Sequence, residues 1–390
     1  MPRLLSFALF FSVMLTLVGA VHYYIWARLV RDTMLPPPWQ RVATAAIVAM
    51  YVLVPLSFFA RRVGASFAVP LVWIASVWMG FLLLFLVVLA AGDLLRGSLA
   101  LAGKLGALPP ADPERRLLLA RWFGLFVLAT TGGLSAVAVR SGLARVALRD
   151  VNVRLRRLPK SLDGLTIVQL TDVHVGPTIG RAFIEDIVAR TNAVSPDVIA
   201  ITGDLVDGSV EDLRAAVAPL AGLKARYGVY FVTGNHEYYS GAPEWCAEIE
   251  RLGIRVLRNE RVSIGNGTDS FDLAGIDDAH AHQFGEGHGP DLGRAVAGRD
   301  PARELVLLAH QPRAVFEAAE HGVGLQLSGH THGGQIWPWN YAVRLQQPVV
   351  RGLARFGETQ VYVSSGTGYW GPPMRLGAPA EITRVTLRTT

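Results

Sequence analysis

Residues 327–335 read Leu-Ser-Gly-His-Thr-His-Gly-Gly-Gln, so His330 and His332 lie one residue apart in a glycine-rich stretch. An apolar run, Val323 to Leu327, precedes them and predicts a short buried strand. On an extended or turning backbone, two imidazoles at positions i and i+2 can converge on neighbouring points in space. The flanking glycines permit tight backbone angles and the close approach of a ligand. A His-x-His pair alone is weak support for a metal site, but four upstream motifs of the same kind strengthen it.

Four earlier apolar runs also end in residues of metal-binding types. They are 165–170 before Thr171-Asp172-Val173-His174, 198–202 before Gly203-Asp204, 229–233 before Gly234-Asn235-His236-Glu237, and 305–309 before His310. Each run is apolar and often β-branched, which is typical of buried strands. Since sites in open α/β sheets collect at the carboxyl ends of strands, we expect these turns to build one site.

The five motifs, in this order, resemble those of the calcineurin-like metallophosphoesterases: D-x-H, G-D, G-N-H-E, H and G-H-x-H. The resemblance covers roughly residues 158–386. It is closer to the membrane-associated bacterial branch, transmembrane proteins with a metallophosphoesterase domain, in G-H-T-H-G-G-Q and in the stretch Gly366–Arg375. It implies an α/β fold in which a four-layer α-β-β-α sandwich follows an all-α transmembrane region.

The resemblance also implies two divalent metal ions, Mn, Fe or Zn, since mixed imidazole, carboxylate and amide donors suit all of them. The implied ligands of the first ion are Asp172, His174, Asp204 and His332. Those of the second are Asp204, Asn235, His310 and His330. Asp204 is the natural bridge, because a carboxylate offers one oxygen to each ion. A hydroxide held by both ions is the implied nucleophile, and His236 is expected to act on the leaving oxygen.

Charge is divided unevenly along the chain. Residues 1–160 carry 18 Lys and Arg against 5 Asp and Glu, whereas residues 161–390 carry 19 against 26. The basic excess therefore lies in the apolar half, which argues against a nucleic-acid groove on the catalytic half. Cys246 is the single cysteine, so no intramolecular disulfide can form, and either side of a membrane is compatible with this.

Four apolar runs reach the length of a membrane span, about 18 residues. They are residues 4–26, 42–60, 67–91 and 122–139, with a loop expected from Leu94 to Pro113. The alternative is a set of buried helices in a large soluble core. We expect residues 1–149 to be a transmembrane region in a bacterial cytoplasmic membrane, and residues 150–390 to be the catalytic domain.

The side of the membrane that the catalytic domain faces stays open. With the N-terminus inside, ten basic residues flank the spans on the cytoplasmic side and eight on the other, which does not decide the orientation. Arg115 and Arg116, before the fourth span, resemble a twin-arginine export signal or are ordinary arginines.

The resemblance implies hydrolysis of a phosphodiester or pyrophosphate bond, and extends to members that act on lipid-linked substrates such as UDP-2,3-diacylglucosamine in lipid A synthesis. That substrate is cytoplasmic, which conflicts with an export signal. The alternatives are a broad-specificity phosphodiesterase for soluble substrates and a membrane sensor that binds metal without turnover. Gln335 and Arg375 are further candidates for substrate contact. Aromatic residues that could line an apolar groove are Trp337, Trp339, Tyr341, Tyr369 and Trp370.

Overall fold

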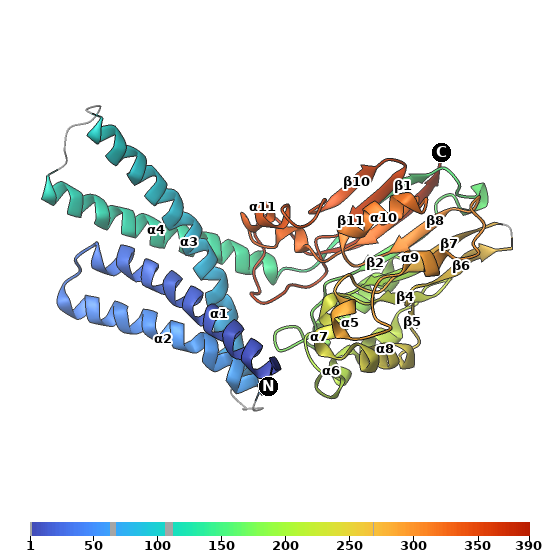
Figure 1. The fold of residues 1–390 in the computed structure, drawn as a ribbon, viewed down its shortest axis with the longest axis horizontal. Helices are drawn as coiled ribbons and strands as arrows, with labels where there is room; N and C mark the ends of the chain where they lie inside the picture. Colours follow the sequence, from blue (N-terminus) through green and yellow to red (C-terminus); the bar gives the residue numbers. More distant parts are fainter. Residues whose placement is uncertain (1, 63–67, 106–111, 268) are drawn as a thin grey trace. The chain divides into compact units, whose positions relative to one another are not determined.

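The computed structural model describes residues 2–62, 68–105, 112–267 and 269–390 (Figure 1). The chain divides into two compact units. The helical unit comprises Met1–Arg140 with Gly371–Met374, and the sheet unit comprises Ser141–Trp370 with Arg375–Thr390. The predicted boundary of the catalytic domain, between residues 149 and 150, stays a prediction.

Four long helices build the helical unit. They are α1 (Pro2–Trp26), continued by the π-helical η1 (Ala27–Arg31), α2 (Pro37–Arg62), α3 (Ala68–Lys104) and α4 (Pro113–Gly142). Each contains a stretch long and apolar enough to cross a membrane. The prediction of four apolar helices is therefore confirmed, although Phe67, where the third was expected to begin, lies outside the described residues.

Helices α3 and α4 are longer than predicted, and the expected loop from Leu94 to Pro113 is wrong over its first part. Helix α3 continues to Lys104, because residues after Ala91 are mostly leucine, alanine and other good helix formers. Helix α4 begins at Pro113, ahead of the predicted start at Trp122. Its first turn is set by Asp112, whose side chain accepts a 2.8 Å hydrogen bond from the Arg115 backbone N–H, and by a proline in the first helical position.

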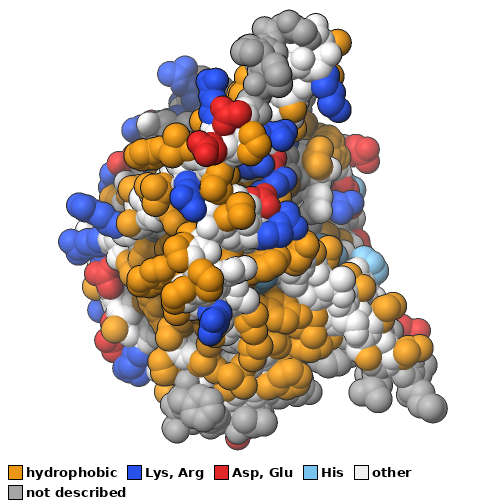
Figure 2. Space-filling view, turned by 90° about the vertical axis from the view of Figure 1, so that its left-hand side faces the viewer, with side chains coloured by type: hydrophobic (Ala, Val, Ile, Leu, Met, Phe, Trp, Pro, Cys, Tyr) orange, Lys and Arg blue, Asp and Glu red, His pale blue; other side chains and the backbone are white. Residues whose placement is uncertain are grey.

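The outer surface of these helices is apolar. Leu17, Val48, Leu86 and Leu125 are among many large hydrophobic residues exposed on them. Figure 2 shows a face of the molecule on which hydrophobic side chains predominate. Helices that are hydrophobic on most of their circumference are typical of a lipid environment. The chain is therefore treated as membrane-associated.

One charged cluster links α1, η1 and α3. Asp93 accepts hydrogen bonds from the Tyr24 hydroxyl (2.6 Å) and from Arg28 Nε (2.9 Å). Arg28 also donates to Asp32 at 2.7 Å, and Arg96 lies 3.6 Å from Asp93. Arg31 also lies 3.0 Å from Asp32, so three arginines and two aspartates pair among themselves, which lowers the cost of carrying charge inside an apolar helical bundle.

Two six-stranded sheets form the core of the sheet unit. The first has the order β1-β12-β2-β3-β4-β5 and the second β10-β11-β9-β8-β7-β6. Strands of the first sheet are β1 (Ala147–Leu155), β2 (Thr166–Leu170), β3 (Val198–Thr202), β4 (Val229–Val232), β5 (Arg255–Val256) and β12 (Glu381–Thr389). Strands of the second are β6 (Glu260–Asn266), β7 (Asp269–Gly275), β8 (Leu305–Leu308), β9 (Leu325–Ser328), β10 (Gly352–Phe356) and β11 (Thr359–Val363).

Three apolar layers separate four structural layers. Side chains of both sheets, such as Ile167, Val198, Leu273 and Leu327, form the layer between the sheets. The outer face of the first sheet packs on α5 (Arg181–Ala193), α6 (Val210–Val217) and α8 (Ala242–Arg251). The outer face of the second sheet packs on α9 (Leu292–Val296) and α10 (Val315–Glu320). The predicted α-β-β-α sandwich is confirmed.

Parallel pairing brings the motif turns together. Strands β2, β3 and β4 run parallel to one another, and so do β7, β8, β9 and β11. Their carboxyl ends therefore lie at one edge of each sheet, and each of the five polar turns follows one of these ends. The short α7 (Asn235–Ser240) and α11 (Trp339–Val343) follow two of these turns.

Candidate metal centre

The motif turns hold their side chains in left-handed backbone conformations. Positive φ angles occur at Asp172 (52°), His174 (55°), Asp204 (52°), His330 (69°) and His332 (49°). For residues other than glycine this region is sparsely populated and typically costs about 1–3 kcal/mol each. Such strain persists where the surrounding structure enforces it, and here it turns the side chains of successive loops inward.

Two glycines make room for the carboxylates. A Cβ atom on Gly329 would lie 2.1 Å from Asp172 Oδ2, and one on Gly234 would lie 2.2 Å from Asp204 Oδ1. No side chain can be accommodated at these distances without displacement of the carboxylate. Glycine is thus required beside each of the two buried aspartates.

Asp172, His174 and His332 form the first donor group, in which one ligand atom from each residue lies within 4.8 Å of the other two. His174 Nε2 is 3.0 Å from His332 Nε2, which in turn is 3.5 Å from Asp172 Oδ1. On its other side, His174 Nδ1 faces Asp207 at 3.1 Å. Because the carboxylate accepts the Nδ1 proton, Nε2 of His174 is left with its lone pair toward the group.

Asp204, His310 and His330 form the second donor group. His310 Nε2 is 3.0 Å from Asp204 Oδ2 and 3.2 Å from His330 Nδ1. The other nitrogen of His310 faces the Thr202 carbonyl at 2.8 Å. A carbonyl can only accept, so the proton of a neutral His310 lies on Nδ1 and Nε2 is free to act as a donor atom.

Asp204 belongs to the second group and also faces the first. Its Oδ2 is 3.0 Å from His310 Nε2 and 3.9 Å from His174 Nε2, and its Oδ1 accepts from the His236 backbone N–H at 2.9 Å. Burial favours the neutral acid, but His310, His236 and His174 around it lower the pKa of Asp204 well below its usual range. The group therefore stays a carboxylate, as a shared ligand must.

These residues fit a pair of divalent cations. Ring nitrogens face one another at 3.0 Å and 3.2 Å, inside a pocket of buried carboxylates. Among the described residues, Asn235 Oδ1 is buried without a hydrogen-bond partner, which is costly unless a ligand satisfies it. With Asp204 shared, each ion would have two nitrogen and two oxygen donors, a mixture that first-row transition metals accept.

His236 lies beside the first group. Its Nδ1 is 2.6 Å from Asp207 Oδ1, the same oxygen that faces His174, and the His174 and His236 rings are 4.6 Å apart. Burial lowers the pKa of His236, but the hydrogen bond to Asp207 and the charges of Asp204, Asp207 and Glu237 outweigh it and raise the pKa to about 9. His236 therefore carries a proton near neutral pH.

Glu237 is fully buried and connects two motif turns. Its Oε2 accepts from the backbone N–H groups of Gly234 (2.6 Å) and Asp204 (2.9 Å), and its Oε1 accepts from that of Leu205 (2.7 Å). The side chain thus fixes the backbone position of Asp204. These contacts fit a side chain that orients a neighbouring motif residue.

Gln335 and Arg375 both hydrogen-bond to the backbone, and their contact with a substrate stays a prediction. Gln335 Nε2 donates to the Trp370 carbonyl at 2.9 Å, and its Oε1 accepts from the Trp370 N–H at 3.0 Å. Arg375 is fully buried and donates to the carbonyls of Ser365 and Ala378, both at 2.8 Å. Both side chains hold the backbone that surrounds His332.

Two polar residues near the centre were not singled out in the sequence. Asp207 follows Asp204 by three residues, in the same turn, and this spacing could have identified it. Asp278 is buried and accepts two hydrogen bonds from Gln311, which itself follows His310. Asp278 comes from the turn after β7, and no pattern in the sequence connects it with Gln311.

Comparison with known proteins identifies the family of the chain. Residues 165–334 match the family model of the calcineurin-like phosphoesterases. An uncharacterized metallophosphoesterase of Campylobacter jejuni is 30% identical over 391 residues, which cover 98% of this chain and 99% of that protein. The chain belongs to the calcineurin-like metallophosphoesterase family. The resemblance stated from the motifs is confirmed at this level.

Two animal relatives match a smaller share of the chain. Transmembrane proteins with a metallophosphoesterase domain from Bos taurus and Danio rerio are 47% and 42% identical, over 61% of this chain. The matched region spans 56% of each of them, so the chain corresponds to about half of their length. The relative from Campylobacter jejuni, by contrast, covers nearly all of this metallophosphoesterase, the helical unit included.

Proposed function

We propose that this metallophosphoesterase is a membrane-anchored hydrolase that cleaves a phosphodiester or pyrophosphate bond with two divalent metal ions. The observation that carries the proposal is the position of Asp204 between two donor groups whose ring nitrogens face inward. Asp172, His174, Asp204 and His332 would hold one ion, and Asp204, Asn235, His310 and His330 the other. When bound, the ions supply positive charge that polarises the phosphate and acidifies a water molecule.

The protein's own residues supply the proton. In hydrolysis a bond from water oxygen to phosphorus forms, the bond from phosphorus to the leaving oxygen breaks, and the leaving oxygen needs a proton. His236 holds one, since its Nδ1–H is bound by Asp207 at 2.6 Å. Its Nε2–H is then available to donate to the leaving oxygen, while Asp207 stabilises the ring in the required orientation. Asp207 thus acts through His236 and His174.

We further propose that the substrate is amphiphilic and lipid-borne, in a bacterial cytoplasmic membrane. Four apolar helices tether the sheet unit, and its acidic balance disfavours free nucleic acid. Membrane tethering raises the local concentration of a substrate that resides in the same bilayer. A phosphodiester or pyrophosphate with its lipid attached is therefore expected to be hydrolysed better than its deacylated headgroup.

The test uses the full-length protein in detergent with added Mn²⁺. Turnover of phosphodiesters, with kcat/KM higher for a lipid-borne ester than for its deacylated analogue, supports the proposal. Equal values would leave the soluble phosphodiesterase as the better description. Two bound Mn²⁺ ions without turnover of any ester would instead indicate the metal-binding sensor.

His236→Ala separates chemistry from metal binding. We expect this variant to keep its metal and to lose about 10²–10⁴-fold in turnover, the usual worth of general acid catalysis. Esters with acidic leaving groups should lose less, because their leaving oxygen needs less protonation. A uniform loss for all leaving groups would count against the role of His236 as the acid.

A further inference from the structure

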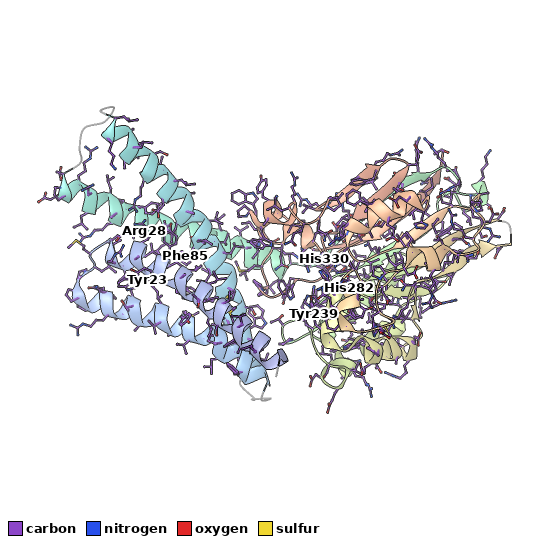
Figure 3. All side chains as sticks on the ribbon, viewed as in Figure 1. Tyr23, Arg28, Phe85, Tyr239, His282 and His330 are labelled. Atoms are coloured by element: carbon purple, nitrogen blue, oxygen red, sulfur yellow. The ribbon has the colours of Figure 1, made fainter. Side chains whose placement is uncertain are left out.

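Two exposed aromatic rings contact His236, and a third contacts one of them. Tyr239 lies 5.3 Å from the His236 ring and Trp370 lies 5.7 Å from it, both in edge-on geometry. Phe284 contacts Tyr239 at 5.8 Å. We call these three residues the aromatic rim. Figure 3 labels Tyr239, from α7, and His330, which follows β9.

All three side chains of the rim are exposed. Tyr239 is 61%, Trp370 56% and Phe284 43% exposed. Packing of the sheet unit thus does not account for them, since a ring that serves only the core would be covered. Exposed apolar surface beside a reaction centre is typical of a ligand-binding surface.

Backbone contacts keep the rim in place. Gln335 binds both the N–H and the carbonyl of Trp370, at 3.0 Å and 2.9 Å. Next to Trp370, the Tyr369 hydroxyl donates to the Thr178 carbonyl at 3.0 Å. Tyr239 is part of the same short helix, α7, that carries Asn235 and His236. Phe284 packs on both Tyr238 (5.6 Å) and Tyr239 (5.8 Å). The rim is therefore preorganised, which lowers the entropy cost of binding.

The position of the rim beside His236 relates it to the leaving group of the substrate. His236 is the proposed donor of the proton to the leaving oxygen, so groups next to His236 lie beside the leaving alcohol. Open ring faces of Tyr and Trp bind planar rings by stacking, with little dependence on the ring's identity. A flexible acyl chain, in contrast, gains most from an enclosed apolar cavity.

We propose that the aromatic rim is a leaving-group subsite that binds a planar aromatic ring, such as that of an aryl alcohol or a nucleoside. This subsite deepens the proposed function and rests on the assignment of His236 to the leaving oxygen. It adds a preference that the metal-ligand motifs do not contain: among esters of equal reactivity, those with a planar leaving group are preferred.

The binding arm of the test does not depend on turnover. Full-length protein in detergent, loaded with Mn²⁺, is titrated by calorimetry with phenyl, cyclohexyl and decyl methylphosphonates, which share one charge. We expect phenyl to bind roughly fivefold or more tightly than cyclohexyl, since stacking requires a planar ring. Equal affinity for these two, or a loss of decyl binding in Trp370→Leu as large as the loss of phenyl binding, would overturn the proposal.

Substitutions in the rim test whether its rings cause the preference for phenyl over cyclohexyl. Trp370→Leu and Tyr239→Leu should remove the preference for phenyl over cyclohexyl, whereas Trp370→Phe, which restores a ring, should recover part of it. Phe316→Leu is the matched control, because Phe316 is 57% exposed on α10 and its ring contacts Phe356 at 5.5 Å. A preference that survives both Trp370→Leu and Tyr239→Leu would show that the rim does not bind the ring.

The activity arm distinguishes this subsite from the proposed function. It compares kcat/KM for methyl phosphodiesters with a phenyl or a fluorinated alkyl leaving group of matched acidity. Turnover of both esters without a phenyl preference would overturn the rim and keep the proposed hydrolase. A phenyl preference in binding that Trp370→Leu abolishes, with no ester turned over, would keep the rim and overturn the hydrolase.

Discussion

Asp204 supplies the carboxylate on which the proposed pair of metal ions depends. Asp204→Asn keeps the shape of the side chain and an acceptor for the His236 N–H, but it removes the charge shared by the two donor groups. We expect most of the bound metal and most of the turnover to be lost, as measured by elemental analysis and phosphodiester hydrolysis. Asp186→Asn, at an exposed carboxylate on α5, is the control. Full metal content with near-normal turnover in Asp204→Asn would refute the bridge.

Asp207 sets the proton affinity of His236 in this structure. The pKa of His236 is raised to about 9, so its proton is present near neutral pH and is lost as the pH rises through that value. Turnover of esters with poor leaving groups should therefore fall on the alkaline side. Asp207→Asn removes the charged acceptor and should move this decline to lower pH, as measured in pH profiles of kcat/KM. Glu211→Gln, an exposed change in α6, should leave the profile in place; an unshifted profile in Asp207→Asn would contradict the role of Asp207.

At the level of residues, the motifs predicted which side chains converge but not what holds them. The turn Gly234-Asn235-His236-Glu237 was recognised, yet the three backbone groups that Glu237 binds come from two different strand ends. Such contacts depend on the register between β3 and β4, which pairs Thr202 with Val232. A linear pattern contains no information on this register. Asp207 could have been predicted, because it shares the turn of Asp204.

At the level of elements, apolar runs located the helices and strands well and their ends less well. The predicted span 42–60 lies within α2 (Pro37–Arg62), and the predicted run 198–202 is β3 (Val198–Thr202). The third apolar run ends at Ala91, but α3 continues to Lys104 past the charged Asp93 and Arg96. A prediction from hydropathy alone ends a membrane span at charged residues such as these. In the structure Asp93 is paired with Arg28 of η1, so the helix can carry the charge and continue.

The pairing of Asp93 yields a prediction for the helical unit. Asp93→Asn removes the anion that Tyr24, Arg28 and Arg96 share, and it leaves Arg28 with Asp32 alone. Hydrogen bonds to charged groups typically contribute about 1.5–3 kcal/mol, and partial exposure of this cluster reduces that figure. We expect a lower Tm in detergent, measured by loss of helical circular dichroism. Glu114→Gln, at an exposed position in the first turn of α4, should leave Tm nearly unchanged; equal Tm values for both variants would show that the cluster adds no stability.

At the level of the whole molecule, the sequence separates two regions of opposite character. The basic excess lies in residues 1–160 and the acidic excess in residues 161–390, and the family match covers residues 165–334 of the acidic part. Family and architecture follow from these patterns, because motif order and apolar length are properties of the linear chain. Orientation in the bilayer does not, since the basic residues that flank the helices are nearly balanced, ten against eight.

An even number of spans has a consequence that does not depend on orientation. If all four apolar helices cross the bilayer, the N-terminus and Thr390 lie on the same side. Cys246 is the only cysteine, so a Cys246→Ala background allows a single new cysteine at Ser6 or at Thr390 to be labelled with a membrane-impermeant reagent in spheroplasts. Both positions should react, or both should be protected until the membrane is permeabilised. Opposite results at the two ends would mean that one of the helices lies outside the bilayer.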